Sequence, residues 1–227
     1  MAKCVKQWRS VALCIAILSL FYVQAANPAQ TKRILVLGNS LSEGFGLKPS
    51  EAYPILLAKK LRDAGLNFEI TNASQTGGTT EGGLERLPAH LKRKIDIFIL
   101  ELGINDAFRG LPVDQIQSNL QQIIDKVKTR NPEVRLVIVG MQLPNYAAND
   151  YVSAFGKIFA DLASKNRAAL VPYLLDGVAG NPLLNLPDGI HPNAAGQKIL
   201  ADDVWRVLEP IAREVAVIPN ANEGSRQ

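Results

Sequence analysis

Cysteine and histidine are scarce in this chain of 227 residues, which contains two of each. Both cysteines, Cys4 and Cys14, lie at the extreme N-terminus, so the rest of the chain has no disulfide, no thiol nucleophile and no thiolate metal site. The histidines, His90 and His191, are too far apart in the sequence to suggest a zinc hydrolase. We therefore predict a protein that needs no metal or other cofactor and is stabilised by its apolar core.

Motifs of several other enzyme classes are also missing. The chain contains neither Gly-x-x-x-x-Gly-Lys-Ser/Thr nor Gly-x-Gly-x-x-Gly, which excludes the nucleotide-binding modules that carry them. It also lacks Gly-x-Ser-x-Gly around Ser40, because Ser42 occupies the last position. A serine hydrolase of the large α/β class that carries Gly-x-Ser-x-Gly is thus excluded.

No apolar run is long enough to span a bilayer comfortably. The run at 11–23 follows Lys3, Lys6 and Arg9 and precedes the small residue Ala25, a pattern typical of a secretory signal peptide. We therefore predict a signal peptide at 1–25 and a linker at 26–32. The protein would be exported, either periplasmic or secreted, with no integral membrane span after cleavage.

The basic character of the chain is mostly a property of this leader. The whole chain has 25 basic and 21 acidic residues and a formal net charge of +4. Removal of the three basic residues in 1–25 leaves 22 basic residues, a net charge near +1 and no basic stripe. No nucleic-acid partner is therefore expected.

After the linker, apolar β-branched runs alternate with amphipathic patterns, which predicts an α/β fold. The predicted strands are 33–38, 68–73, 95–102, 135–140 and 169–175, and the predicted helices are 50–64, 80–92, 112–129, 151–165 and 193–215. Such an alternation is typical of a three-layer α/β/α sandwich around a five-stranded parallel sheet. We predict one domain at 33–215 and a polar tail at 216–227.

Candidate catalytic residues follow the predicted strands. Ser40 follows the first strand, Gly77 the second and Asn105 the third, and parallel strands bring their carboxyl ends to one edge, where ligands bind. On its own, Gly38-Asn39-Ser40 is equally consistent with a simple turn. The three positions together favour a site.

A serine nucleophile needs a base, and the base needs an orienting group. His90 lies among charged residues on a predicted helix and is interpreted as a solvated surface residue. His191 has Asp188 three residues before it, so the carboxylate can hold one ring nitrogen while the other takes the proton of Ser40. The backbone N–H groups of Ser40 and Gly77 and the side-chain amide of Asn105 could then stabilise an oxyanion.

Four sequence blocks resemble the GDSL or SGNH hydrolase family, and most closely its bacterial periplasmic acyl thioesterase, lysophospholipase or arylesterase branch. The likeness extends from about 33 to 211 and is carried by Gly38-Asn39-Ser40-Leu41-Ser42, Asn72-Ala73-Ser74-Gln75-Thr76-Gly77, Leu102-Gly103-Ile104-Asn105-Asp106 and Asp188-Gly189-Ile190-His191-Pro192. The resemblance implies a flavodoxin-like SGNH hydrolase fold and hydrolysis through a covalent acyl-enzyme. It also implies catalysis by Ser40, Asp188 and His191, with Ser40, Gly77 and Asn105 as the oxyanion hole.

The chain departs from the family pattern at Asn39, where the family usually has Asp. Asparagine keeps an acceptor oxygen for local N–H groups but carries no charge. We therefore expect activity to survive, and Asn39→Asp to change hydrolysis less than Ser40→Ala does. Glu101, a charged residue within an apolar strand, is interpreted as a paired structural residue.

Apolar residues in the predicted loops around the site favour an acyl chain, although several of them could simply pack the loops. Together with Arg109, which could meet a polar head group, the candidate substrate contacts are Phe45, Phe108, Leu111, Leu143, Pro144 and Tyr146. The predicted substrate is a small acyl ester or a lipid-like ester, hydrolysed by a monomer or weak dimer. Alternatives are a carbohydrate O-acetyl esterase or an acyl-ligand binding module that has lost its chemistry, although retention of Ser40, Asp188 and His191 argues against the latter.

Overall fold

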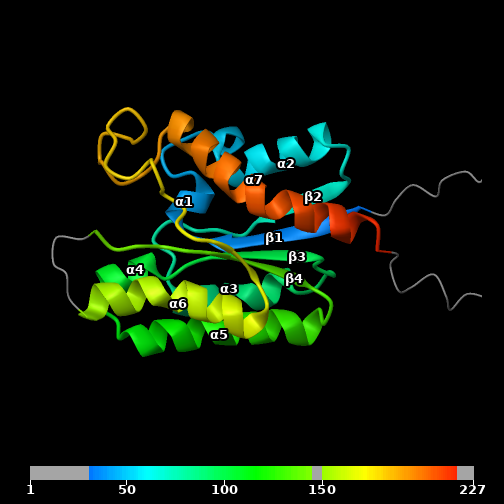
Figure 1. Cartoon of the computed structure of the whole chain (residues 1–227), viewed down its shortest axis with the longest axis horizontal. Helices are drawn as coiled ribbons and strands as arrows, with labels where there is room; N and C mark the ends of the chain where they lie inside the picture. Colours follow the sequence, from blue (N-terminus) through cyan, green and yellow to red (C-terminus); the bar gives the residue numbers. More distant parts are fainter. Residues whose placement is uncertain (1–30, 145–149, 219–227) are drawn as a thin grey trace, which may run out of the picture.

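A single parallel sheet of five strands organises the molecule (Figure 1). The computed structural model describes residues 31–144 and 150–218. The strand order is β2-β1-β3-β4-β5, and every neighbouring pair is parallel. The strands are β1 (Lys32–Gly38), β2 (Phe68–Asn72), β3 (Ile97–Glu101), β4 (Arg135–Val139) and β5 (Ala169–Val171).

Helices cover both faces of this sheet. Figure 1 shows α2 (Tyr53–Asp63) and α7 (Ala194–Ala216) on one face, and α3 (Thr80–His90), α5 (Val113–Arg130) and α6 (Asp150–Asn166) on the other. The short helices α1 (Ser40–Glu43) and α4 (Ile104–Phe108) and the 3-10 turn η1 (Pro49–Glu51) lie at the carboxyl ends of the strands. The predicted three-layer fold with five parallel strands is thereby confirmed.

The core lies between the sheet and each helix layer. All five residues of β3, the central strand, are buried, because a parallel strand covered on both faces has no solvent side. On α5 the apolar stripe formed by Ile116, Leu120, Ile123, Ile124 and Val127 is buried against the sheet. This core fixes the strand ends from which the site is built.

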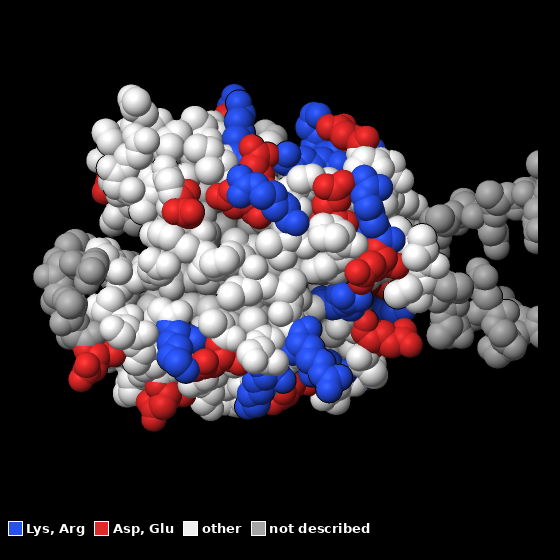
Figure 2. All heavy atoms as spheres, in the orientation of Figure 1, with Lys and Arg blue, Asp and Glu red and all other residues white. Residues whose placement is uncertain are grey.

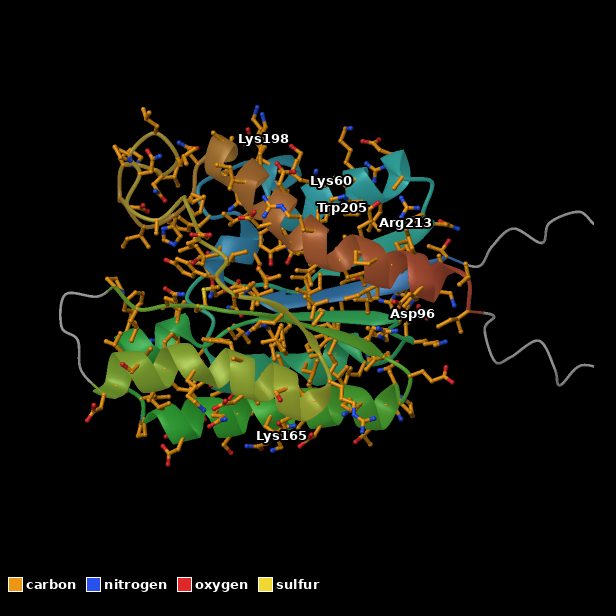
Figure 3. The ribbon with its side chains drawn as sticks, in the orientation of Figure 1. Lys60, Asp96, Lys165, Lys198, Trp205 and Arg213 are labelled. Carbon is orange, nitrogen blue, oxygen red and sulfur yellow. The ribbon has the colours of Figure 1, made fainter. Side chains whose placement is uncertain are left out.

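Charged residues lie over the outer surfaces of the helices. Lys60 on α2 forms an ion pair of 2.6 Å with Asp202 on α7, and its Nζ lies 6.0 Å from the ring centroid of Trp205 (Figure 3). At the edge where the strands begin, Asp96 accepts the backbone N–H of Arg33 (Figure 3). Lys32 Nζ donates to the carbonyl of Ile218 at 2.9 Å, so the two ends of the described chain meet there.

Several predicted boundaries were wrong. Strand β5 ends at Val171 and not at 175, because the chain turns at Pro172. The carbonyl oxygen of Pro172 lies so close to Gly140 that a Cβ at position 140 would be only 2.2 Å from it. The helix predicted from residue 50 begins at Tyr53, after the separate turn η1. Strand β1 already includes Lys32, and α7 continues to Ala216, one residue beyond the predicted domain on each side.

The predicted signal peptide at 1–25 and most of the linker and of the polar tail lie outside the described residues. Within 31–144 and 150–218, the structure contains no helix that is both long and apolar enough to cross a membrane.

Candidate active site

Ser40 is the first residue of α1 and follows β1 after a single residue, Asn39, at the carboxyl edge of the sheet. The side chain of Asn39 caps this helix by accepting the N–H of Leu41 at 2.8 Å. Gly38 must be glycine, because a Cβ would lie 2.5 Å from Ser42 Oγ and 2.7 Å from Glu101 Oε2. Ser40 is 8% exposed.

The structure brings together the three residues that the sequence predicted as nucleophile, base and orienting group. His191 Nε2 lies 3.0 Å from Ser40 Oγ, and His191 Nδ1 lies 2.7 Å from Asp188 Oδ2. These distances form a continuous hydrogen-bonded chain from carboxylate to hydroxyl. Ser40 and His191 are 151 residues apart in the sequence.

Asp188 is held ionised by its own loop. Its Oδ1 accepts the backbone N–H groups of Ile190 at 2.9 Å and His191 at 3.0 Å. The backbone N–H of His191, its imidazole and the N–H of Ile190 together lower the pKa of Asp188 to about 2. The carboxylate is therefore charged at neutral pH.

The three donors predicted for the oxyanion follow three strand ends at the sheet edge that carries Ser40. Among the described residues, the backbone N–H groups of Ser40 and Gly77 have no hydrogen-bond partner. Asn105 uses one amide hydrogen to donate to the carbonyl of Gly78 at 3.0 Å, which leaves its second amide hydrogen available. A developing oxyanion requires hydrogen-bond donors of this kind that have no partner already.

Beneath the nucleophile lies a buried polar cluster centred on Glu101, which is 0% exposed. Glu101 accepts the backbone N–H of Asn39 at 3.1 Å, the Asn39 side-chain amide at 2.6 Å and the Ser42 hydroxyl at 2.6 Å. The Tyr53 hydroxyl lies 2.7 Å from Ser42 Oγ. Glu101 is therefore paired, as interpreted from the sequence, and its hydrogen-bond donors are neutral groups.

Burial raises the pKa of Glu101 to about 7, against the opposing effect of its hydrogen bonds from Ser42 and Asn39. Burial, with the nearby carboxylate as a second cause, also raises the pKa of the Tyr53 hydroxyl. The side chain of Asn39 thus makes two hydrogen bonds. Its oxygen caps α1, and its amide nitrogen donates to the buried carboxyl group of Glu101.

Comparison with known proteins places these features in a family. Residues 36–199 match the model of the GDSL-like Lipase/Acylhydrolase family. The chain is 39% identical over 199 residues to Esterase TesA of Pseudomonas aeruginosa, covering 87% of this chain and 96% of that protein. It is 36% identical to Thioesterase 1/protease 1/lysophospholipase L1 of Escherichia coli, covering 81% of this chain and 86% of that protein.

Solved structures agree. A crystal structure of TesA superposes with a TM-score of 0.75 at 38% identity, covering 79% of this chain and 99% of that one. The psychrotrophic esterase EstA from Pseudoalteromonas gives 0.73 at 29% identity, covering 79% and 97%. The chain belongs to the GDSL-like lipase/acylhydrolase family. It is accordingly a carboxylic ester hydrolase.

The site of this GDSL-like hydrolase also depends on residues that the sequence analysis did not single out. Gln197, buried on α7, accepts the N–H of Tyr53 at 2.8 Å and donates to the carbonyl of Leu41 at 3.0 Å, which ties α1 and α2 to the helix that follows His191. The sequence did contain a signal for Gln197. It lies three residues before Leu200 and seven before Val204, which places a polar glutamine on the apolar face of a helix.

Two further residues fix the strand ends of the hydrolase. Arg86 on α3 donates to the carbonyls of Gly38 at 2.7 Å and Ala73 at 3.1 Å, and burial lowers the pKa of its guanidinium. Asp106, fully buried beside Asn105, accepts the N–H and the hydroxyl of Thr80. Neither contact could be read from local sequence, because each joins separate strand ends.

The residues predicted to contact substrate differ in their exposure and in their distance from the triad. Phe45 packs on His191 with ring centroids 4.4 Å apart, Phe108 is 60% exposed at the end of α4, and Arg109 donates to the carbonyl of Gly77 at 3.2 Å. Leu111 and Leu143 are partly buried and pack against the core. Pro144 is exposed, and Tyr146 lies outside the described residues.

His90 is only partly solvated, contrary to its interpretation as a solvated surface residue. It ends α3, and burial, followed by the charges of Arg86 and Arg33, lowers its pKa.

Cavities of different character open at the two edges of the sheet. A polar hollow of about 440 Å³ borders Gly77 and is lined in part by Gln75, Thr79 and Arg86. Another cavity, of about 720 Å³, opens where the strands begin and shares no lining residue with the triad. Within the described residues, no group of three or more His, Cys, Asp or Glu side chains is placed to hold a metal ion.

Proposed function

We propose that this hydrolase is a serine esterase in which Ser40 attacks the ester carbonyl, His191 transfers the proton and Asp188 orients the imidazole. The observation that supports this most directly is the hydrogen-bonded chain from Asp188 through His191 to Ser40. A serine hydroxyl becomes an effective nucleophile when a base accepts its proton as it attacks.

The reaction would proceed in two halves. In the first, the Ser40 proton moves to His191 Nε2 while Ser40 Oγ bonds to the carbonyl carbon, and the carbonyl oxygen becomes an oxyanion. Collapse expels the alcohol or thiol, which takes the proton from His191 and leaves an acyl group on Ser40. In the second half, water gives a proton to His191, attacks the acyl carbon and releases the carboxylic acid with the regenerated hydroxyl.

The oxyanion in both halves would be stabilised by the N–H groups of Ser40 and Gly77 and by the Asn105 amide. Their hydrogens are free in the described structure, so no existing bond has to break when the charge develops. Loss of one such donor costs about 3–4 kcal/mol of transition-state stabilisation.

The proposed substrates are aryl and acyl esters, extending to lysophospholipids and thioesters. On the face shown in Figure 2, the end of the molecule that carries α1 and the loop between β5 and α7 is mostly uncharged, whereas Lys and Arg gather over the helices and the opposite end. Exposed Phe45 adds apolar surface beside His191, and Phe108 adds exposed apolar surface at the end of α4. Relatives named Arylesterase and Thioesterase 1/protease 1/lysophospholipase L1 support this range.

We also propose that the protein is exported after removal of residues 1–25 and acts as a monomer or weak dimer. The pattern of basic, apolar and small residues in the leader supports export. All residues of the triad come from one chain, so no partner subunit is needed to complete the site.

The test is hydrolysis of p-nitrophenyl esters with acyl chains from two to sixteen carbons. Ser40→Ala should lower kcat by roughly 10⁴-fold or more, because no other group can form the acyl-enzyme. The control is Ser118→Ala, which removes an exposed hydroxyl on α5 and should leave kcat unchanged. The chain-length optimum would define the acyl preference.

Two outcomes would favour other functions. Turnover of acetate esters alone would indicate a carbohydrate O-acetyl esterase. A folded protein with no turnover on any ester would contradict the esterase proposal and favour an acyl-ligand binding module.

A further inference from the structure

Glu43 connects the helix of the nucleophile to the turn that carries Gly77. It is the last residue of α1, three residues after Ser40. Its carboxylate oxygen Oε2 accepts the backbone N–H of Thr76 at 2.6 Å and also accepts the Thr76 hydroxyl. One exposed side chain thus spans two of the strand ends that form the site, from position 43 to position 76.

Three other polar groups in this turn have hydrogen-bond partners of their own. Gly78 N–H donates to the carbonyl of Gln75 at 2.9 Å, and the carbonyls of Gly77 and Gly78 accept from Arg109 and Asn105. The N–H of Gly77 is left without a partner in the described chain. Because Gly77 has a φ of 69°, a conformation that favours glycine, the direction of this N–H depends on how its neighbours are fixed.

Helix α1 is anchored to the same segment by a second, independent contact. The side-chain amide of Asn72 donates to the carbonyl of Ser42 at 2.8 Å, and Asn72 Oδ1 accepts the N–H of Ser74 at 3.2 Å. Removal of the Glu43 carboxylate would therefore leave α1 joined to the end of β2. What it would release is Thr76, the residue whose peptide group carries the Gly77 N–H.

We propose that Glu43 is a positioning residue that holds the Gly77 N–H in place relative to Ser40. This inference rests on the proposed function, in which that N–H stabilises the oxyanion. Glu43 does not touch the reacting atoms. It acts through Thr76. Its loss should therefore reduce the stabilisation of the transition state and leave substrate binding almost unchanged.

The expected result for Glu43→Ala is a fall in kcat of about 10- to 100-fold with KM changed by less than about 3-fold, because misplacement of one oxyanion donor costs up to the value of the donor. Glu43→Gln keeps an acceptor oxygen for Thr76 and should retain most of the activity. Thr76→Ser keeps both donors and should behave as wild type, whereas Thr76→Val should lose part of the rate. The double variant Glu43→Ala/Thr76→Val should be no slower than Glu43→Ala alone, because Glu43→Ala already removes the acceptor of the Thr76 hydroxyl.

A second measurement separates this role from a merely structural one. An alkylboronic acid forms a tetrahedral adduct on a catalytic serine and uses the same oxyanion donors. Its inhibition constant should rise in Glu43→Ala by about the factor by which kcat falls. The matched control is Glu81→Ala, which removes an exposed acid in the first turn of α3 and should change neither value.

Three outcomes would overturn the inference: a folded Glu43→Ala variant with kcat within 2-fold of wild type, a fall in kcat without a change in boronate affinity, or an equal fall in Glu81→Ala. If Glu43→Ala does not fold, as judged by thermal unfolding, Thr76→Val carries the same test. Failure of the proposed function has a different signature, since Ser40→Ala would then retain hydrolysis.

Discussion

At the scale of single residues, Glu101 shows how one buried carboxyl shapes the nucleophile turn. It accepts hydrogen bonds from Asn39 and Ser42, the residues on either side of Ser40 and Leu41. An aspartate at position 39 would place a second carboxyl where the amide nitrogen now lies, 2.6 Å from Glu101 Oε1, and the pair would have to share a proton. Asn39 removes that requirement and so offers a physical reason for the departure from the family pattern.

The raised pKa of Glu101 predicts that stability depends on pH. Its pKa is about 7 in the folded protein and 4.5 without the influence of the fold. A raised carboxyl pKa stabilises the fold fully below the unfolded value and loses that contribution as pH rises through the folded value. We expect Glu101 to lower the free energy of unfolding by about 3 kcal/mol between about pH 4 and pH 8.

Urea unfolding of the wild type and of Glu101→Gln at several pH values measures this contribution. The free energy of unfolding of the wild type should fall relative to that of the variant as pH rises. Asn39→Asp serves as a second comparison and should steepen the dependence, because it adds a carboxyl beside Glu101. A constant difference between wild type and Glu101→Gln across this range would contradict the prediction.

At the scale of elements, α1 and α7 are the two helices whose relative position makes the triad. Helix α1 carries Ser40, while His191 lies just before α7, which begins at Ala194 after its cap Asn193. Gln197 joins them by its hydrogen bonds to the carbonyl of Leu41 and the N–H of Tyr53. The 3.0 Å between His191 and Ser40 therefore depends on a residue that touches neither.

Gln197→Ala should destabilise the fold by about 2–4 kcal/mol, because it leaves the N–H of Tyr53 and the carbonyl of Leu41 buried without partners. The measurement is chemical denaturation, with kcat determined well below the unfolding transition. We expect kcat to fall as well, since the two helices lose their link. The control is Lys198→Ala, a variant of the exposed residue next to Gln197. Equal losses of stability and kcat in both variants would contradict the explanation.

At the scale of the whole molecule, the candidate site and the two ends of the described chain lie at opposite edges of the sheet. The carboxyl ends of β1, β2 and β3 are followed by Ser40, Gly77 and Asn105, whereas Lys32 at the start of β1 lies at the opposite edge and bonds to Ile218. A segment attached before Lys32 therefore joins the fold at the edge away from the nucleophile.

Expression of the full chain in a bacterium should yield an exported protein whose first residue is Ala26, as determined by intact mass and N-terminal sequencing. The full chain and the form beginning at Ala26 should have the same kcat/KM, because the leader joins the fold at the edge opposite Ser40. An exported product that retains residues 1–25, or a product confined to the cytoplasm, would contradict the predicted signal peptide.

Local sequence determined a large part of this protein. Period and composition were sufficient for the five strands, the long helices and the parallel three-layer fold, because burial on one or both faces leaves a regular apolar pattern. Chemistry pointed to His191 and Asp188 as base and orienting group, because the chain has only two histidines and one of them follows an aspartate by three residues. Ser40 became the candidate nucleophile only together with the other strand-end positions and the family resemblance. The short helices α1 and α4 escaped prediction, because four or five residues carry no periodicity.

Only the tertiary structure decided the contacts that join distant segments. Glu101 with Asn39, Gln197 with Leu41 and Glu43 with Thr76 each link different strand ends or helices, 33 to 156 residues apart. A side chain leaves a signal in the local sequence when its neighbours along the chain share its environment. These side chains are chosen by partners that folding alone brings within 3.1 Å, so their roles become visible only when the strands are side by side.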